Sequence, residues 1–428
     1  MQRGSLQPSS RVIPRTDYIG VMNTRVALAL TGGLVAWVTW GVAQQLEETF
    51  YIPLDDPSIQ YGQRPTADPV ARLQQRLDRG EAKLELSPNG LGYLPSVLKQ
   101  LNINPDSQSL VFSKTSTQAE KIGPRTPRAL YFNDDVAVGF VRDSDVMEIA
   151  SLDPQQGVHF YVLVRTDKPE FAQSDGCLRC HQGAVTLGIP GLLVSSVHPT
   201  SQVRQEHGNS FMTDHRTPLS GRWGGWYVTG TTGSQTHLGN NTNLVDPVRS
   251  GGPSAQPTQN LTSLADLFDT SRYLAPTSDI VALMTLEHQT RMTNLMIRIG
   301  WDARRGIPAD QLNPEIEQMV TYMLFADEEP LKAPVKGVST FTQTFPQRGP
   351  RDSKGRSLRD FDLKTRLFRY PLSYMIYSAA FDGMPDNVRD RVYKRLYERL
   401  SADPSEAGKA ILEIVRATKT NLPDYWRL

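Results

Sequence analysis

Cys177, Cys180 and His181 form a C-x-x-C-H motif, and they include the only two cysteines in a chain of 428 residues. This spacing meets a definite chemical need, because two thiols three residues apart can add across the vinyl groups of a haem as thioethers. The histidine that follows then reaches the iron as its proximal ligand. The motif therefore predicts one covalent haem c, anchored by Cys177 and Cys180 and ligated by His181.

The two thiols have other possible uses, and each of these leaves part of the motif unexplained. A zinc site needs further thiolates or a second histidine pair, and the chain has no other cysteine. A thioredoxin-like redox pair would leave the position of His181 as a coincidence. A plain structural disulfide needs an oxidising compartment. Covalent haem uses all three side chains and is the leading interpretation, with a redox pair or a structural disulfide as alternatives.

The five-residue motif resembles that of the c-type cytochromes. More loosely, most of the chain after residue 43 is similar to large exported bacterial proteins that carry a cytochrome c domain and have no assigned activity. The stretches that carry this looser resemblance are 131–141, 211–231, 278–289 and 369–382. The resemblance implies haem binding but supplies no substrate. The chain also departs from the small soluble cytochromes c, which are far shorter and purely helical.

An uncharged run of eighteen residues, 26–43, lies near the N-terminus and follows four arginines and a single acidic residue. A basic flank before an apolar run is typical of a signal peptide or a signal anchor. Small residues at 41–43 favour cleavage, whereas the length of the run barely suffices for an uncleaved single-helix membrane anchor. In both cases the arginines place the rest of the chain outside the cytoplasm, in the periplasm or beyond.

The charge balance narrows the classes of partner. The 46 basic and 45 acidic residues leave a net charge of +1, which argues against nucleic acid as a partner. A mean hydropathy of −0.40 excludes a polytopic membrane protein. We expect instead a redox partner protein or a small-molecule electron donor or acceptor, together with the membrane if residues 26–43 stay uncleaved.

Hydrophobic patterning predicts an α+β fold around the motif. Residues 67–79 and 94–101 have helical patterns. Two β-rich runs, 129–132 and 136–141, flank the turn Asn133-Asp134-Asp135 and predict a hairpin, with a third strand at 158–165. We interpret Asp134 and Asp135 as a solvated turn and not as a catalytic pair.

The second half of the chain becomes increasingly helical. Two strand-like runs follow the motif at 191–197 and 225–230, and residues 230–262 have the composition of a long loop. Helical patterns then begin near Pro276, at 313–325 and after Pro371. The expected organisation is a signal or anchor at 1–43, a haem c-binding α+β domain at 44–300 and a mainly helical region at 301–428.

A second iron ligand is expected on the helix that Ser278 or Asp279 can cap. His288 lies on a stripe at every fourth position, whose members are Ile280, Met284, His288, Met292 and Met296. Haem iron often takes a second ligand from His or Met, so His288 is the leading candidate for the distal position. The alternatives are His215, His237, Met284, Met292 or an open iron position.

A basic and aromatic cluster follows His215 along the chain. It consists of Arg216, Arg222, Trp223 and Trp226. Arginine can pair with haem propionates and tryptophan can cover the flat ring, so Arg222 and Trp223 are predicted to bind the haem. An ordinary strand start with surface arginines is the alternative.

Three functions are compatible with these features. The leading one is an exported c-type haem protein that takes part in electron transfer. An extracytoplasmic haem oxidoreductase with an open iron site would explain the length of the chain better. A haem-based sensor would have to act through a partner, because only about 25 residues precede the apolar run.

Overall fold

The computed structural model describes residues 51–197, 210–242 and 259–427. The apolar run 26–43 lies outside these residues. Ile52–Leu428 group into one compact unit, and the boundary that we expected at residue 300 falls inside a continuous helix, Ile280–Arg304. In the described part of the chain, no helix is long and apolar enough to cross a bilayer.

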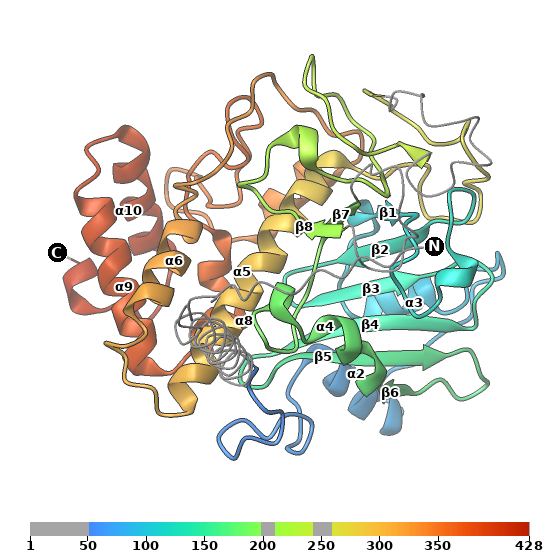
Figure 1. Ribbon diagram of the computed structural model, residues 1–428, viewed down its shortest axis with the longest axis horizontal. Coiled ribbons are helices and arrows are strands. Elements are labelled where there is room, and N and C mark those ends of the chain that lie inside the picture. Colours follow the sequence, from blue (N-terminus) through green and yellow to red (C-terminus); the bar gives the residue numbers. More distant parts are fainter. Residues whose placement is uncertain (1–50, 198–209, 243–258, 428) are drawn as a thin grey trace, which may run out of the picture. The chain divides into compact units, whose positions relative to one another are not determined.

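The fold is α+β, as the sequence predicts (Figure 1). The strands are β1 (Ser109–Val111), β2 (Arg128–Phe132), β3 (Val136–Phe140), β4 (Val146–Asp153), β5 (Gly157–Val164), β6 (Phe171–Gln173), β7 (Ser195–Val197), β8 (Ser210–Met212) and β9 (Trp226–Tyr227). The helices are α2 (Pro69–Asp78), α3 (Leu94–Gln100), α4 (Leu178–His181), α5 (Ile280–Arg304), α6 (Asn313–Met323), α7 (Phe341–Thr344), α8 (Ala379–Asp382), α9 (Asp386–Ser401) and α10 (Glu406–Thr418).

An antiparallel sheet of seven strands within the described residues runs in the order β6-β5-β4-β3-β2-β1-β9. The predicted hairpin is confirmed, with Phe132 opposite Ala137 across β2 and β3. The turn between them is built by Asn133, whose Oδ1 accepts hydrogen bonds from the backbone N–H groups of Asp135 and Val136. The pattern analysis missed β4, which pairs with both β3 and β5.

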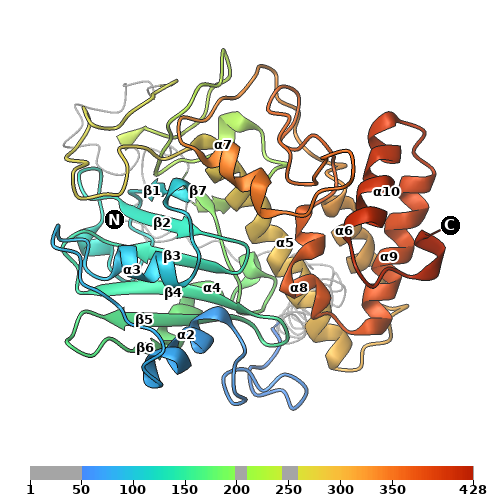
Figure 2. The same cartoon turned by 180° about the vertical axis from the view of Figure 1, so that it is seen from behind.

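The two faces of the sheet are covered by different elements. Alternate residues of a strand point to opposite faces, so Ala129 and Tyr131 lie on the face of the sheet that α2 and α3 cover. Phe132 on the same strand belongs to the core on the other face, where α4 and α5 lie. Figure 1 shows α4 in front of the sheet, and Figure 2 shows α2 and α3 in front of it from the opposite side.

Helix α5 is buried along most of its length and joins the sheet to the C-terminal helices. Asp279 caps it as predicted, with Oδ1 accepting from the backbone N–H groups of Val281 and Ala282. The C-terminal region is mainly helical, as expected. The stripe of α9 that recurs every fourth residue is buried there and consists of Val388, Val392, Leu396 and Leu400.

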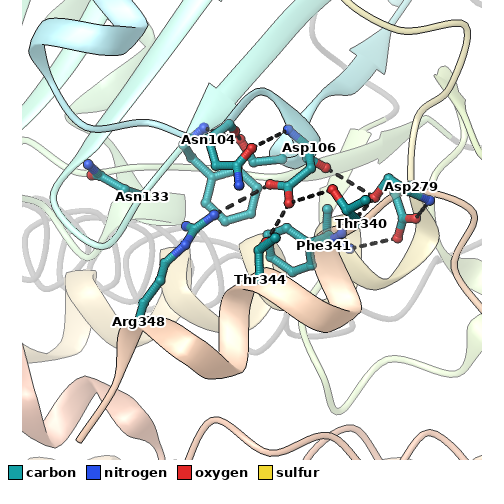
Figure 3. Close-up of polar contacts among 12 residues, drawn as sticks. Asn104, Asp106, Asn133, Asp279, Thr340, Phe341, Thr344 and Arg348 are labelled. Atoms are coloured by element: carbon teal, nitrogen blue, oxygen red, sulfur yellow. Dashed lines mark hydrogen bonds and ion pairs between the residues drawn. The ribbon is translucent and has the colours of Figure 1, made fainter.

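Two buried carboxylates connect the segment around α7 to the sheet side of the unit (Figure 3). The Oδ2 atom of Asp279 accepts hydrogen bonds from the backbone N–H groups of Val338 and Ser339 at 2.8 and 2.7 Å. Asp106 accepts hydrogen bonds from the hydroxyls of Thr340 and Thr344, and Arg348 pairs with it. These contacts hold α5 and the α7 segment in a fixed relation to the strands.

Candidate functional site

The C-x-x-C-H motif folds into the short helix α4, with Cys177 as its first flanking residue. Positions i, i+3 and i+4 of a helix lie on one face, so Cys177, Cys180 and His181 project to the same side. Both cysteines are free thiols; Cys177 is half-buried and Cys180 is exposed. The backbone thus presents both thiols and the imidazole together, which is the donor set that covalent haem attachment needs.

The imidazole of His181 is held by the backbone of Gly191. Its Nδ1 lies 2.9 Å from the carbonyl oxygen of Gly191, and the N–H of Gly191 donates to the carbonyl of His181 at 2.8 Å. A carbonyl only accepts, so Nδ1 carries the proton and Nε2 keeps its lone pair. Within the described residues Nε2 has no hydrogen-bond partner. Burial lowers the pKa of His181, against the opposing hydrogen bond to Gly191, so the ring is neutral.

Asn294 on α5 fixes the segment that holds His181. Its Oδ1 accepts from the N–H of Leu192 at 2.9 Å, and its Nδ2 donates to the carbonyl of Leu192 at 2.7 Å. A Cβ at Gly191 would lie 2.5 Å from Asn294 Oδ1, so this close approach requires glycine. Asn294 is fully buried. The helix therefore positions His181 indirectly, through the backbone at 191–192.

A cavity of about 140 Å³ lies between α4, α5 and the sheet and opens to solvent. Cys177, Cys180 and His181 all line it. Its other walls are mostly apolar and include Leu130, Phe132, Ala137, Ala150, Phe160, Leu192, Val194 and Leu286.

One end of the cavity is charged. Arg128 of β2 and Glu148 of β4 form an ion pair of 2.8 Å there, and the hydroxyls of Ser116 and Thr117 donate to the same carboxylate. Burial alone would raise the pKa of Glu148, but Arg128 and these hydroxyls outweigh it, so the pKa lies below its ordinary value. The carboxylate is therefore ionised at neutral pH.

His288 does not line this cavity, although its helix does. Leu286 and Thr290 of α5 form part of the wall, and His288 is two residues from each, which places it about 160° around the helix from both. Its Nδ1 lies 2.9 Å from Nδ1 of His215, and its Nε2 lies 2.7 Å from the hydroxyl of Ser373. Both ring nitrogens are thus engaged on the far side of α5.

Arg222 and Trp223 are also absent from the cavity wall. The three guanidinium nitrogens of Arg222 bind Glu287 Oε2 at 3.1 Å and the carbonyl oxygens of Thr217 and His215. Every nitrogen of this side chain therefore makes a hydrogen bond inside the core, away from the cavity wall. Trp223 is fully buried, and its ring lies edge-on to that of His237, with centroids 5.5 Å apart.

The structure thus separates the predicted residues into two groups. Cys177, Cys180 and His181 surround the cavity, whereas His215, His288 and Arg222 meet in a buried polar cluster elsewhere. The remaining candidates for a second ligand, His237, Met284 and Met292, are buried and do not line the cavity. Within the described ranges, no three His, Cys, Asp or Glu side chains form a group that could hold a bare metal ion.

The sequence reasoning missed three residues of the site: Arg128, Gly191 and Asn294. Arg128 alternates with Leu130 and Phe132 along one strand, which is the only sequence signal that places them on one face. Gly191 and Asn294 are 103 positions apart, and nothing local in the sequence indicates that they meet. Comparison with protein-family models, with curated proteins and with solved structures gives no match to this chain.

Proposed function

We propose that this protein is a c-type haem protein that takes part in electron transfer, with one haem attached through Cys177 and Cys180 and ligated by His181. The observation that carries the proposal is the state of the His181 ring. Its Nδ1 is tied to a backbone carbonyl, and its Nε2 is unpartnered within the described residues, beside a mostly apolar cavity. Metal-binding histidines are typically oriented in this way, by a hydrogen bond from the other ring nitrogen.

The residues present fit a haem in two respects. Two thiols and an imidazole share one helix face, as thioether attachment and axial ligation require. The cavity wall is apolar over most of its area, which suits a porphyrin ring. When bound, haem supplies a one-electron redox couple whose potential depends on its axial ligand, hydrogen bonds and burial. The chain's own part is to hold the imidazole neutral and oriented and to keep water from the apolar walls.

The proposed location follows from the N-terminal run alone. Residues 26–43, which lie outside the described residues, are proposed to be a signal peptide or membrane anchor that places the chain in the periplasm or otherwise outside the cytoplasm. Bacterial c-type haem is attached in that compartment, so location and cofactor support each other.

Expression in a host that matures c-type haem tests the proposal. We expect intact-mass analysis to show one added haem, and pyridine treatment to give the absorbance of a haem with two thioether bonds. The double variant Cys177→Ala/Cys180→Ala should carry no covalent haem, whereas His237→Gln, a buried histidine outside the cavity, should keep it. Wild-type protein without added mass or haem absorbance would exclude the proposal.

A second candidate function, a haem oxidoreductase or haem-based sensor with an open iron site, is favoured by the composition of the cavity wall. Among the described residues that line it, His181 is the only histidine and none is a methionine. Spectra of the ferric and ferrous protein, with and without carbon monoxide, distinguish the two. A high-spin ferric form that binds carbon monoxide when reduced indicates an open site, and a low-spin form that does not bind it indicates a carrier.

A further inference from the structure

We propose that Arg128 makes the charged end of the cavity a binding site for a carboxylate, and that a haem propionate supplies it. The inference rests on the proposed function and deepens it, because it assigns to Arg128 the role that the sequence suggested for Arg222. It is carried by the polarity of the cavity and by the unused donors of the Arg128 side chain.

The cavity changes from apolar to charged along the direction of the strands. The pairing register places Phe132, Ala137, Ala150 and Phe160 in one row across β2 to β5. The next row on the same face contains Leu130, Gly139 and Glu148. Arg128 lies two residues before Leu130, about 7 Å further along the strand. A ligand with a flat apolar body and acidic groups on one edge matches this gradient.

Arg128 has hydrogen-bond donors to spare. Its Nη2 pairs with Glu148 Oε2 at 2.8 Å, while Nε is buried without any acceptor and Nη1 has no partner within the described residues. A guanidinium has five N–H groups, so the pair with Glu148 leaves most of them unused. Glu148 also keeps two hydroxyl partners, Ser116 and Thr117, so it does not depend on Arg128 alone.

Gly139 provides the space that brings Arg128 to this position. It lies between Leu130 and Glu148 in the register, and a Cβ there would be 2.6 Å from Nε of Arg128. The guanidinium therefore crosses β3 over a residue without a side chain. Gly139→Ala should displace Arg128 without removing any charge, which provides a test that is independent of deleting the arginine.

The first experiment measures the haem midpoint potential against pH in the full-length, haem-loaded protein. Arg128→Met should lower the potential, because the positive charge that disfavours oxidation is lost. It should also raise the inflection pH of the potential by about 1–3 units, because an adjacent arginine lowers a carboxylate's pKa by that much. Glu148→Gln should shift the potential in the opposite direction, and Gly139→Ala in the same direction as Arg128→Met.

Arg165→Met is the matched control, because Arg165 pairs with Asp145 outside the cavity wall. It should change neither the potential nor the inflection. If Arg128→Met leaves Glu148 unpaired and the protein fails to fold, the double variant Arg128→Met/Glu148→Gln replaces it and should still raise the inflection pH. Indistinguishable profiles for the Arg128 and Arg165 variants would overturn the proposal.

A second experiment identifies the source of the carboxylate. Calorimetric titration of the haem-free double variant Cys177→Ala/Cys180→Ala with acetate and propionate should show binding that Arg128→Met abolishes. No binding to the haem-loaded protein means that the haem's own propionate fills the site, and binding there as well means that a free carboxylate does. If the haem-free protein binds neither acetate nor propionate, the carboxylate site is excluded. This experiment needs no haem, so its result does not depend on whether the proposed function is correct.

Discussion

His181 is oriented by the backbone before any ligand is present. Its Nδ1–H donates to the carbonyl of Gly191, and that carbonyl belongs to a segment that Asn294 holds through both the N–H and the carbonyl of Leu192. A hydrogen bond of this kind increases the electron density at Nε2 and stabilises the higher oxidation state of a bound metal. The ring thus has a fixed tautomer and a fixed direction, which are the two properties that axial ligation requires.

Buried histidines outside the cavity predict how stability depends on pH. Burial lowers the pKa of His237 to about 4 and that of His288 to about 3, compared with an unfolded value near 6.5. Between these values the unfolded chain binds more protons, so the free energy of unfolding falls as pH decreases. For His237, the loss from pH 6.5 to 4 should reach roughly 3 kcal/mol.

Urea denaturation at a series of pH values measures this effect. The variant His237→Gln should remove that part of the pH dependence, because glutamine does not titrate. The control variant Gln63→Ala, at an exposed residue that does not titrate, should leave the slope unchanged. If the free energy of unfolding depends on pH in the same way in wild type and His237→Gln, His237 is not the source of this pH dependence.

The predicted site residues show how much the sequence alone can indicate about individual side chains. Local spacing alone places Cys177, Cys180 and His181 on one helix face, and all three line the cavity; their binding of haem stays a prediction. The periodicity correctly put His288 on a buried stripe, but the helix is buried on nearly all sides, and periodicity cannot tell which side meets the motif. Arg222 had the right residue type for a propionate, but its buried partner Glu287 is 65 positions away in the sequence.

Helix α5 serves two sides of the molecule with two stripes. Leu286, Thr290 and Asn294 are spaced by four residues and face the cavity and the segment at 192. His288 and Met296 face the C-terminal region, where they contact Ser373 and Ser378. One rigid element therefore connects the site to the helical region.

The helix predicts an effect of Asn294 on the haem that a merely structural residue would not have. Asn294→Ala should loosen the segment at 191–192, weaken the hydrogen bond to His181 and so raise the haem midpoint potential. The control is Gln289→Ala on the same helix: Gln289 is also buried, and its amide also holds backbone, donating to the carbonyl of Asn133 at 2.6 Å. It should reduce stability without moving the potential.

Redox titration of both variants at matched haem content provides the comparison. Equal potentials for the two variants would show that Asn294 is only a packing residue. Asn294→Asp keeps the acceptor for Leu192 N–H but loses the donor, and we expect its potential to lie between those of wild type and Asn294→Ala.

Elements with a strong local signal were predictable and the others were not. The β2–β3 hairpin was found because Asn133 marks a turn between two apolar runs, and α5 because Asp279 is a capping residue. Strand β4 was missed because Glu148 and Ser151 interrupt its apolar character. Those polar residues are explained only by tertiary structure: Glu148 pairs with Arg128, and Ser151 is fully buried.

At the scale of the whole molecule, the sheet separates two hydrophobic cores. The core on the α2 and α3 side includes Leu94, Val97 and Tyr131. The other core includes the cavity wall, α5 and the C-terminal helices. Because strand residues alternate between the faces, β1 to β5 and β9 contribute to both cores without mixing them.

This division predicts that stability and haem properties respond to different substitutions. Leu94→Ala, fully buried on the α3 side, should lower the free energy of unfolding by about 2–5 kcal/mol and leave the haem spectrum and potential unchanged. Leu286→Ala, in the cavity wall, should change both, because it admits water next to the haem. Thermal unfolding and redox titration of the two variants check this, and a potential shift in Leu94→Ala would contradict it.

Under the proposed function, the β-sheet is a partition between a purely structural compartment behind the strands and the compartment that would hold the haem. An engineer could make the protein more heat-resistant by repacking the compartment behind the strands, with no retuning of its electronic behaviour. Substitutions that accumulate in that rear compartment during evolution would likewise leave the chemistry of the cavity unchanged.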